Sequence, residues 1–136
     1  MNELVRLIEF PCYKEDESNL VAIEGSSKEV PFSIVRVFYV KDKIGSKRGR
    51  HAHYQCTQLL ICTNGSIEVI CDDGNSIKQY ILDKPNFGLI VKPGIWAEQK
   101  YLEDNSILTV LCDRHYEEND YIYDYEEFKK IERSRF

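Results

Sequence analysis

The segment Gln58-Leu-Leu-Ile-Cys-Thr-Asn64-Gly65-Ser-Ile67-Glu-Val-Ile-Cys-Asp72 carries the strongest indication of the fold class. Two apolar, β-branched runs flank Asn64-Gly65, and an Asn-Gly pair between such runs favours the tight turn of a β-hairpin. Asp73-Gly74 repeats this signal before a third run at 77–82. We therefore predict strands at 58–63, 67–72 and 77–82, joined as two consecutive hairpins.

Short runs of the same kind continue in both directions from this stretch. Strands at such regular spacing, with Gly and Pro between them, are typical of an antiparallel sandwich or barrel. Asp124, followed three positions later by Glu127, resembles a capping box that opens a short helix through Phe128 and Ile131. We predict an all-β fold, a small antiparallel β-barrel or jelly roll with a short C-terminal helix, as one domain over residues 1–136. The other expected strands lie at 4–10, 20–24, 33–40, 88–91, 97–101 and 107–111.

The composition is that of a soluble globular chain, with 136 residues, 43% of them hydrophobic and 30% charged. A net charge of -5 argues against nucleic acid as a partner, so a phosphate-bearing ligand would need a few local cations. The first residues contain no long apolar run, which argues against a signal peptide or a membrane span. The five cysteines have no CxxC spacing, so we expect buried free thiols in a cytoplasmic protein rather than a nucleophile.

The residues with catalytic potential are concentrated in Gly45-Ser-Lys-Arg-Gly-Arg-His51-Ala-His53. Residues two apart on a strand point to the same face, so His51 and His53 are expected to project together. Imidazole has an ordinary pKa of about 6.5, which suits proton transfer near neutral pH. The alternative is an incidental pair on a surface strand. We favour the catalytic interpretation because two histidines share a face beside a glycine-rich, cationic segment.

The histidine pair also resembles a known superfamily. Five residues fall at the spacing of the first cupin motif: Gly45, His51, His53, Gln58 and Gly65. The segment around Pro93-Gly94 resembles the second cupin motif. Metal-dependent cupins typically use three histidines and a glutamate, but here Gln58 replaces the glutamate and Ala97 lies near the position of the third histidine. Two histidines alone make a weak transition-metal site, so we expect no metal and no cofactor.

Further segments make the resemblance more specific, and Arg48-Gly49-Arg-His51-Ala-His53 is its most specific element. The other matching segments are 31–40, 64–66, 72–74, 82–85, 93–96 and 120–122. Through them the chain resembles the sugar nucleotide 3,4-ketoisomerases, the WxcM-like cupins. This resemblance implies a homodimer that acts on a dTDP-linked 4-keto-6-deoxyhexose. The carbonyl would move from carbon 4 to carbon 3 through an enediol or enediolate, for deoxyamino sugar biosynthesis in lipopolysaccharide or another glycan.

The resemblance also implies the roles of three residues. His51 is expected to be the base that removes the proton at carbon 3, and His53 its proton-handling partner. Tyr39 would polarise an oxygen or relay a proton; the alternative is an aromatic ring that fills the barrel.

Four further residues are candidates for binding the substrate. Arg48 and Arg36 are expected to hold the pyrophosphate, because guanidinium groups match phosphate oxygens; for Arg36 a surface ion pair is an equal alternative. Gln58 would orient a histidine or a sugar hydroxyl. Trp96 is expected to stack near the ligand, or else to anchor the core.

Two other functions remain alternatives. A deoxysugar epimerase also removes a proton beside a 4-keto group in a cupin barrel, although such enzymes are usually longer. A non-catalytic cupin would bind the nucleotide sugar without turnover. Glu17-Ser18 and Ala97 depart from the residues that many family members carry, so we assign no configuration at carbon 4 of the product.

Overall fold

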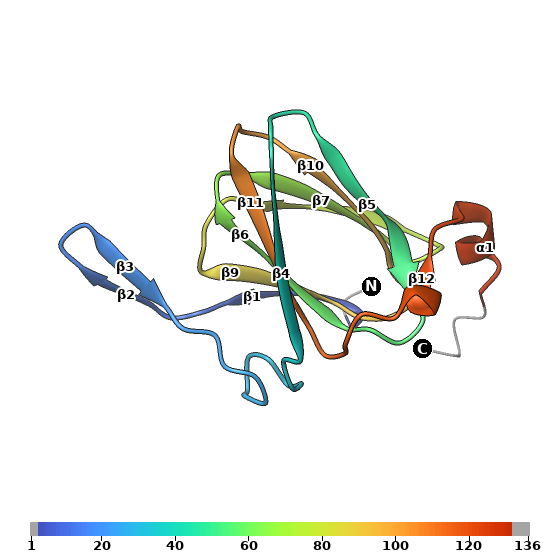
Figure 1. The fold of residues 1–136 in the computed structure, drawn as a ribbon, viewed down its shortest axis with the longest axis horizontal. Coiled ribbons are helices and arrows are strands. Elements are labelled where there is room, and N and C mark those ends of the chain that lie inside the picture. Colours follow the sequence, from blue (N-terminus) through green and yellow to red (C-terminus); the bar gives the residue numbers. More distant parts are fainter. Residues whose placement is uncertain (1–2, 132–136) are drawn as a thin grey trace.

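In the computed structural model, which describes residues 3–131, two five-stranded antiparallel sheets face each other (Figure 1). The first sheet has, in spatial order, β1 (Val5–Glu9), β9 (Phe87–Val91), β6 (Gln58–Asn64), β11 (Ser106–Cys112) and β4 (Arg36–Asp42). The second has β12 (Tyr121–Ile122), β5 (Lys47–His53), β10 (Trp96–Tyr101), β7 (Ile67–Asp72) and β8 (Ile77–Leu82). This is the jelly-roll arrangement that the strand pattern predicts.

One of the two expected hairpins is wrong. Asp73-Gly74 does join the paired strands β7 and β8. Asn64-Gly65, however, turns the chain from the first sheet into the second, since β6 pairs with β9 and β11. Residues 58–62 of β6 are buried without alternation, as expected for a strand covered on both faces, whereas β7 shows a more alternating pattern. The tight turn could be predicted from the Asn-Gly pair, but the strands that pair with β6 could not.

The main hydrophobic cluster fills the space between the sheets, and two smaller clusters cover their outer faces. The segment before β4 packs over the outer face of the first sheet through Val30, Phe32 and Ile34. Four cysteines lie buried as free thiols, as expected. Burial raises the pKa of the Cys71 thiol to about 12 and that of Cys62 to about 11, so both behave as small apolar side chains.

The C-terminal segment forms a short helix, as the capping pattern predicts. Asp124 caps α1 (Tyr125–Lys129) by accepting a hydrogen bond from the backbone N–H of Glu126. The helix ends before the expected Ile131 and buries Phe128 against Trp96 and Ala52 on the outer face of the second sheet. The 3-10 turn η1 (Glu118–Asp120) and β12 precede it, and the sequence pattern did not predict either.

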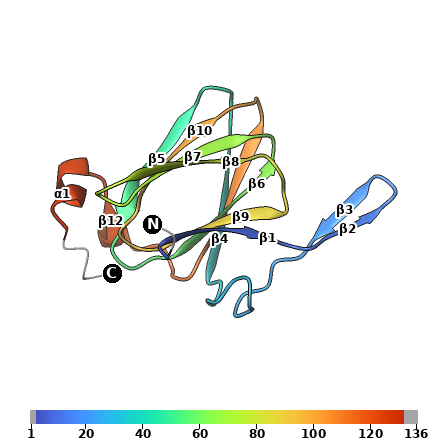
Figure 2. The ribbon, with the colours of Figure 1, turned by 180° about the vertical axis from the view of Figure 1, so that it is seen from behind.

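A two-stranded hairpin, β2 (Cys12–Glu15) and β3 (Ser18–Val21), projects from the body at the end opposite α1 (Figures 1 and 2). Tyr13 and Leu20 on it are exposed. Val21 at the base of this arm packs against the cluster on the first sheet. Isolated two-stranded hairpins are at best marginally stable in water, so a partner surface for Tyr13 and Leu20 would stabilise the arm. No helix among residues 3–131 is long and apolar enough to cross a membrane.

The turn that links the sheets provides a stability prediction. Gly65 has φ +85°, and a Cβ there would meet the Oγ of Ser106 and lie 2.9 Å from its Cα. Gly45 has a similar φ of +88° but open space around it. Gly45→Ala should therefore lose about 1 to 2 kcal/mol, the cost of a left-handed backbone for an L-residue. Gly65→Ala should lose clearly more, measured by urea unfolding; equal losses would contradict the steric argument.

Candidate active site

A cavity opens between the two sheets and is lined by residues of β4, β5, β6, β10 and β11 together with Tyr121. Four residues singled out from the sequence line it: Arg36, Arg48, His51 and Gln58. The rest of the wall is mainly apolar, including Phe38, Leu60 and Val110. A concave apolar site with a few convergent polar groups is the usual form of a small-molecule binding site.

An irregularity in β5 brings Arg48 and His51 to the same cavity. In a regular strand, residues three apart point to opposite faces. Here Arg50 has φ +63°, and the pairing with β10 slips by one residue, since Ala97 lies opposite His51 but Glu98 opposite Gly49. Such a bulge re-aims the side chains that flank it. The cationic group and the imidazole therefore both face the ligand space.

Beyond the bulge, β5 follows the regular alternation that predicts the histidine pair. The rings of His51 and His53 meet edge to face with centroids 5.0 Å apart. Ala52 between them points the other way, into the cluster under α1. The Tyr121 ring lies 5.0 Å from His51 and 4.4 Å from His53 between centroids. His51 lines the cavity, whereas His53 is buried in contact with its ring.

Both imidazoles are held in the neutral form. Burial lowers the pKa of His51, although a hydrogen bond with the backbone carbonyl of Gly49 opposes the shift. Burial, together with the nearby His51, lowers the pKa of His53 to about 4, against the opposing effect of Asp120. A neutral imidazole has a free lone pair, so His51 can accept a proton from a group in the cavity at neutral pH.

The two arginines lie on different strands of the cavity wall. Arg48 is half-exposed, and its Nε donates to Asp42 Oδ2 at 3.0 Å. Arg36 lies over the Phe38 ring at 4.5 Å and near the Tyr116 ring at 5.1 Å. The guanidinium groups add positive charge to an otherwise largely uncharged cavity, which suits a phosphate-bearing ligand.

Gln58 lies in the cavity wall directly opposite Cys112 in the strand pairing. Its amide nitrogen donates to Cys112 Sγ at 3.6 Å, so the donor group is engaged by the thiol rather than by a histidine. The side-chain oxygen remains the group that a sugar hydroxyl could use.

Tyr39 and Trp96 do not line the cavity. For Trp96 this agrees with the second of the two positions expected from the sequence, a core anchor. Tyr39 alternates with the lining residues Phe38 and Val40 along β4 and therefore projects outward, with 72% of its surface exposed. Trp96 is buried beneath α1, and its indole N–H donates to Glu98. The role expected for Tyr39 therefore has no geometric basis within one chain, and Trp96 serves as a core anchor.

The donor atoms near the histidines do not form a favourable metal site. Ala97 lies directly opposite His51, where a third histidine would be needed. Among residues 3–131, one group of three potential ligands lies close together, namely His53, Cys56 and Asp120. A hydrogen bond with Cys112 and burial raise the pKa of the Cys56 thiol, and Asp120 Oδ2 already accepts hydrogen bonds. A protonated thiol and an engaged carboxylate are poor ligands.

Sequence reasoning assigned no role to Asp120 or Tyr121, although both touch the histidine pair. Their segment, Asp120-Tyr121-Ile122, does carry part of the family resemblance, and that was the available signal. Residues 67 positions apart meet here because β12 pairs with β5, with Tyr121 opposite His53. A strand of two residues gives no periodic pattern from which this pairing could be read.

Comparison with known proteins finds relatives that match nearly the whole chain. A TDP-4-oxo-6-deoxy-alpha-D-glucose-3,4-oxoisomerase from Aneurinibacillus thermoaerophilus is 44% identical over 126 residues, which cover 92% of this chain and 90% of the relative. The structure of the sugar 3,4-ketoisomerase QdtA from Thermoanaerobacterium thermosaccharolyticum in complex with TDP superposes with a TM-score of 0.93 at 33% identity, covering 100% of this chain and 99% of QdtA. A histidine-to-asparagine variant of QdtA holds TDP-4-keto-6-deoxyglucose.

A more distant structure shows the fold alone. ChmJ, a 3'-monoepimerase from Streptomyces bikiniensis, has a TM-score of 0.77 at 16% identity over 87% of this chain and 68% of ChmJ.

The family model described as "FdtA: WxcM-like, C-terminal" matches residues 3–133, nearly the whole sequence. The chain therefore belongs to the WxcM-like FdtA family of sugar nucleotide 3,4-ketoisomerases.

Proposed function

We propose that this chain converts a TDP-linked 4-keto-6-deoxyhexose, with TDP-4-keto-6-deoxyglucose as the substrate to test first, into the 3-keto isomer for deoxysugar biosynthesis. The observation that carries the proposal is a neutral His51 in the wall of a cavity that also holds two arginines. The 44% identical relative has this oxoisomerase activity in its name. Five free thiols suit the reducing cytoplasm, where we place the reaction.

The isomerisation moves one hydrogen between carbons and one between oxygens. His51 removes the proton from carbon 3, and the electron pair forms the carbon 3–carbon 4 double bond, while the carbonyl oxygen at carbon 4 becomes the negative oxygen of an enediolate. The proton of the carbon 3 hydroxyl then passes to the carbon 4 oxygen, and the carbon 3 oxygen becomes the new carbonyl as carbon 4 accepts a proton from the His51 imidazolium. The sum is a hydrogen transfer within the sugar, so no external oxidant or reductant takes part.

The surroundings of His51 suit both halves of this cycle. A base with a lowered pKa is unprotonated in the free enzyme, so it is ready for the first proton transfer. The proton that it accepts gives an imidazolium beside a negative enediolate, and this attraction lasts only while the intermediate exists. Arg48 and Arg36 would bind the pyrophosphate and Gln58 a sugar hydroxyl, so that carbon 3 is held against the imidazole.

We propose that the reaction needs no metal. The structural reasons are the neutral amide of Gln58, the methyl group of Ala97 opposite His51, and the engaged donors around His53. A base and two proton-transfer steps complete the isomerisation, so no Lewis acid is required by the proton balance.

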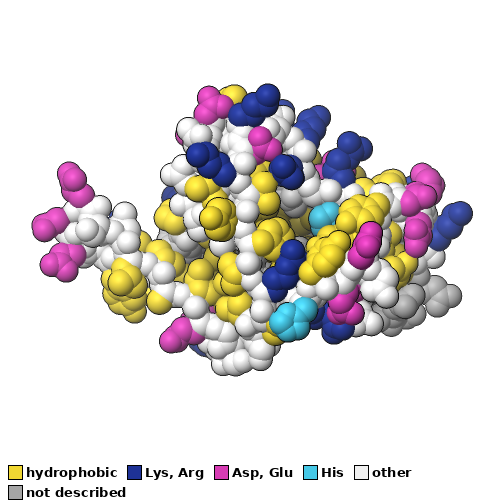
Figure 3. Space-filling view, viewed as in Figure 1, with side chains coloured by type: hydrophobic (Ala, Val, Ile, Leu, Met, Phe, Trp, Pro, Cys, Tyr) yellow, Lys and Arg dark blue, Asp and Glu magenta, His cyan; other side chains and the backbone are white. Residues whose placement is uncertain are grey.

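We also propose a homodimer that covers the apolar outer face of β4. Val37 and Tyr39 on β4 and Tyr13 and Leu20 on the projecting hairpin are more than half exposed. Figure 3 shows hydrophobic side chains gathered on this side of the molecule, over β4 and towards the hairpin. Both β1 and β4 are edge strands of the first sheet, and a second copy would protect an edge and give the hairpin a packing surface.

Replacing the base should abolish most of the turnover. His51→Asn keeps side-chain size and polarity but removes the proton acceptor, so turnover should fall at least about a hundredfold, in the lower range for general-base removal. His115→Asn, at an exposed position, is the matched control and should be near native. Product NMR gives the rate and the ketone position, and a ketone that stays at carbon 4 would identify an epimerase instead. Near-native turnover of a folded, TDP-binding His51→Asn variant would show that the base is another residue.

Chelation should leave the activity intact. After prolonged dialysis against a strong chelator, the turnover of TDP-4-keto-6-deoxyglucose should stay at its initial value, because the donor set is too poor for a stable divalent site. Elemental analysis should find less than stoichiometric metal. A chelated enzyme that is inactive and regains activity with one divalent ion would overturn metal independence.

Light scattering at working concentration should give about twice the 16.0 kDa chain mass. Tyr39→Lys, which places a charge on the proposed interface, should shift the protein towards monomer. Ile77→Lys, at an equally exposed apolar residue of β8, is the control and should remain dimeric. A monomeric native chain contradicts the proposal, and equal effects of the two variants contradict the choice of face.

A further inference from the structure

The mechanism above leaves one buried carboxylate unused. Asp120 Oδ2 lies 3.0 Å from His53 Nδ1, and both side chains are less than one-tenth exposed. The geometry points to Asp120 as a positioning residue that fixes the tautomer and the ring orientation of His53 for proton transfer at the substrate. This inference rests on the proposed function for the reaction itself, but the tautomer can be measured without any substrate.

The hydrogen bond determines where the proton of His53 lies. An ionised carboxylate only accepts hydrogen bonds, so Nδ1 carries the proton and donates it to Asp120. The other ring nitrogen, Nε2, then carries a lone pair. That atom is fully buried and has no hydrogen-bond partner among the described residues. An unpaired buried acceptor is unfavourable for stability, so its presence beside the ligand cavity indicates a role in binding or proton transfer.

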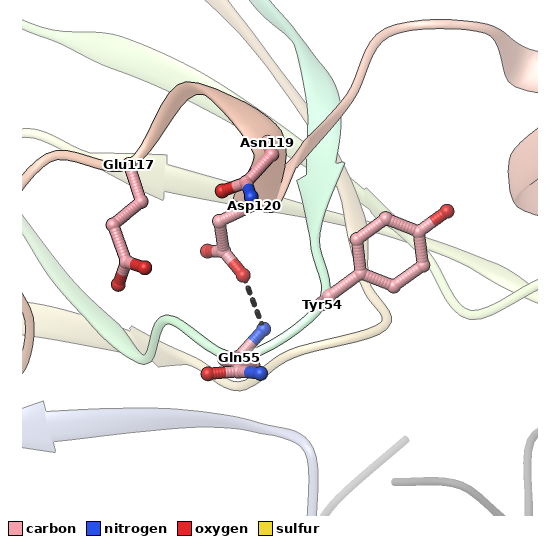
Figure 4. A pocket seen from close by; sticks show the side chains of 5 residues that line it. All are labelled: Tyr54, Gln55, Glu117, Asn119 and Asp120. Atoms are coloured by element: carbon pink, nitrogen blue, oxygen red, sulfur yellow. Dashed lines mark hydrogen bonds between the residues drawn. The ribbon is translucent and has the colours of Figure 1, made fainter.

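Asp120 is itself held rigidly. Besides His53 it accepts the backbone N–H of Cys56 at 3.2 Å through Oδ2 and that of Gln55 at 2.7 Å through Oδ1. Figure 4 shows the bond to Gln55 from the side of a separate polar pocket, with the carboxylate between η1 and the loop after β5. Tyr121, the next residue, pairs with His53 through β12. Three N–H donors and the strand pairing thus fix the carboxylate against the ring, as a supporting residue requires.

The position of the His53–Asp120 pair suits the proton that moves between the two oxygens of the substrate. His51 handles the hydrogen at carbon, and its ring meets that of His53 at 5.0 Å between centroids. The proton that passes from the carbon 3 hydroxyl to the carbon 4 oxygen needs a carrier, and His53 Nε2 is an unpaired acceptor next to His51. While His53 carries this proton, it is an imidazolium, and the Asp120 carboxylate stabilises its charge. Asp120 does not line the cavity, so it should affect turnover more than binding.

A purely structural role is the alternative, because the same carboxylate caps the loop between β5 and β6. Asp113 offers a matched comparison. Its Oδ1 accepts the backbone N–H of Thr57 at 3.0 Å in the same loop, but it makes no hydrogen bond to a histidine. Asp113→Asn therefore perturbs the loop in a similar way and leaves the imidazole alone.

The test compares Asp120→Asn, Asp120→Glu and Asp113→Asn with the native enzyme. An amide has one acceptor oxygen for three N–H donors, so Asp120→Asn should lose the fixed tautomer. Nitrogen-15 NMR of the imidazoles should show that His53 is protonated at Nδ1 and unprotonated at Nε2. This result is expected for both the native enzyme and Asp113→Asn. Asp120→Asn should show a mixed or reversed tautomer, with kcat reduced at least about tenfold, as is usual for loss of a supporting hydrogen bond. The KM and the calorimetric Kd for TDP should change little, and Asp120→Glu should recover part of the kcat.

Three results would overturn the inference: native His53 protonated at Nε2, a folded Asp120→Asn variant with native kcat, or an equal loss of kcat in Asp113→Asn. The first is read from the native protein, so it remains decisive even where Asp120→Asn does not fold. Failure of the proposed function is a separate result, since a native enzyme that does not isomerise TDP-4-keto-6-deoxyglucose leaves the tautomer measurement unaffected.

Discussion

The pairing of β5 with its two neighbours is the interaction on which the site depends. On one side, β10 pairs with β5 across the bulge at Arg50, which turns Arg48 and His51 towards the same cavity. On the other side, β12 pairs with β5 and places Asp120 and Tyr121 against His53. β5 thus receives its geometry from both of its neighbours in the second sheet, and other strands complete the wall of the cavity.

The bulge also explains the glycine in the Arg48-Gly49-Arg50-His51 segment. Gly49 has φ +82°, and a Cβ there would lie 2.9 Å from the backbone oxygen of Ala97. A side chain at this point would clash with β10 and disturb the pairing that maintains the bulge. Glycine adopts the positive φ at Gly49 without steric cost, whereas the positive φ of Arg50 is local strain that the surrounding pairing maintains. The strain at Arg50 lowers stability but is part of the bulge that places Arg48 and His51 at one cavity.

Burial has opposite chemical consequences for the cysteine thiols and for the histidine imidazoles. Around Cys62 and Cys71 it keeps thiols protonated and inert, which serves packing alone. Around His51 and His53 it lowers the pKa and keeps the imidazoles neutral, so that each retains a lone pair that can accept a proton. The same desolvation therefore stabilises the core and prepares the site, because the neutral form is inactive for a thiol but active for an imidazole.

The fold class, the histidine pair and the turn positions could be predicted from the sequence, because these features depend on local periodicity and on turn residues. The side of β5 on which His51 and His53 meet follows from a two-residue repeat, and Asp124 caps its helix through its nearest neighbours. Four other features became visible only in the folded chain: Asn64-Gly65 changes sheet, Tyr39 faces outward, Trp96 lies under α1, and Asp120 meets His53. Each of these depends on which distant strand lies alongside, and a strand's own pattern specifies its two faces but not its neighbours.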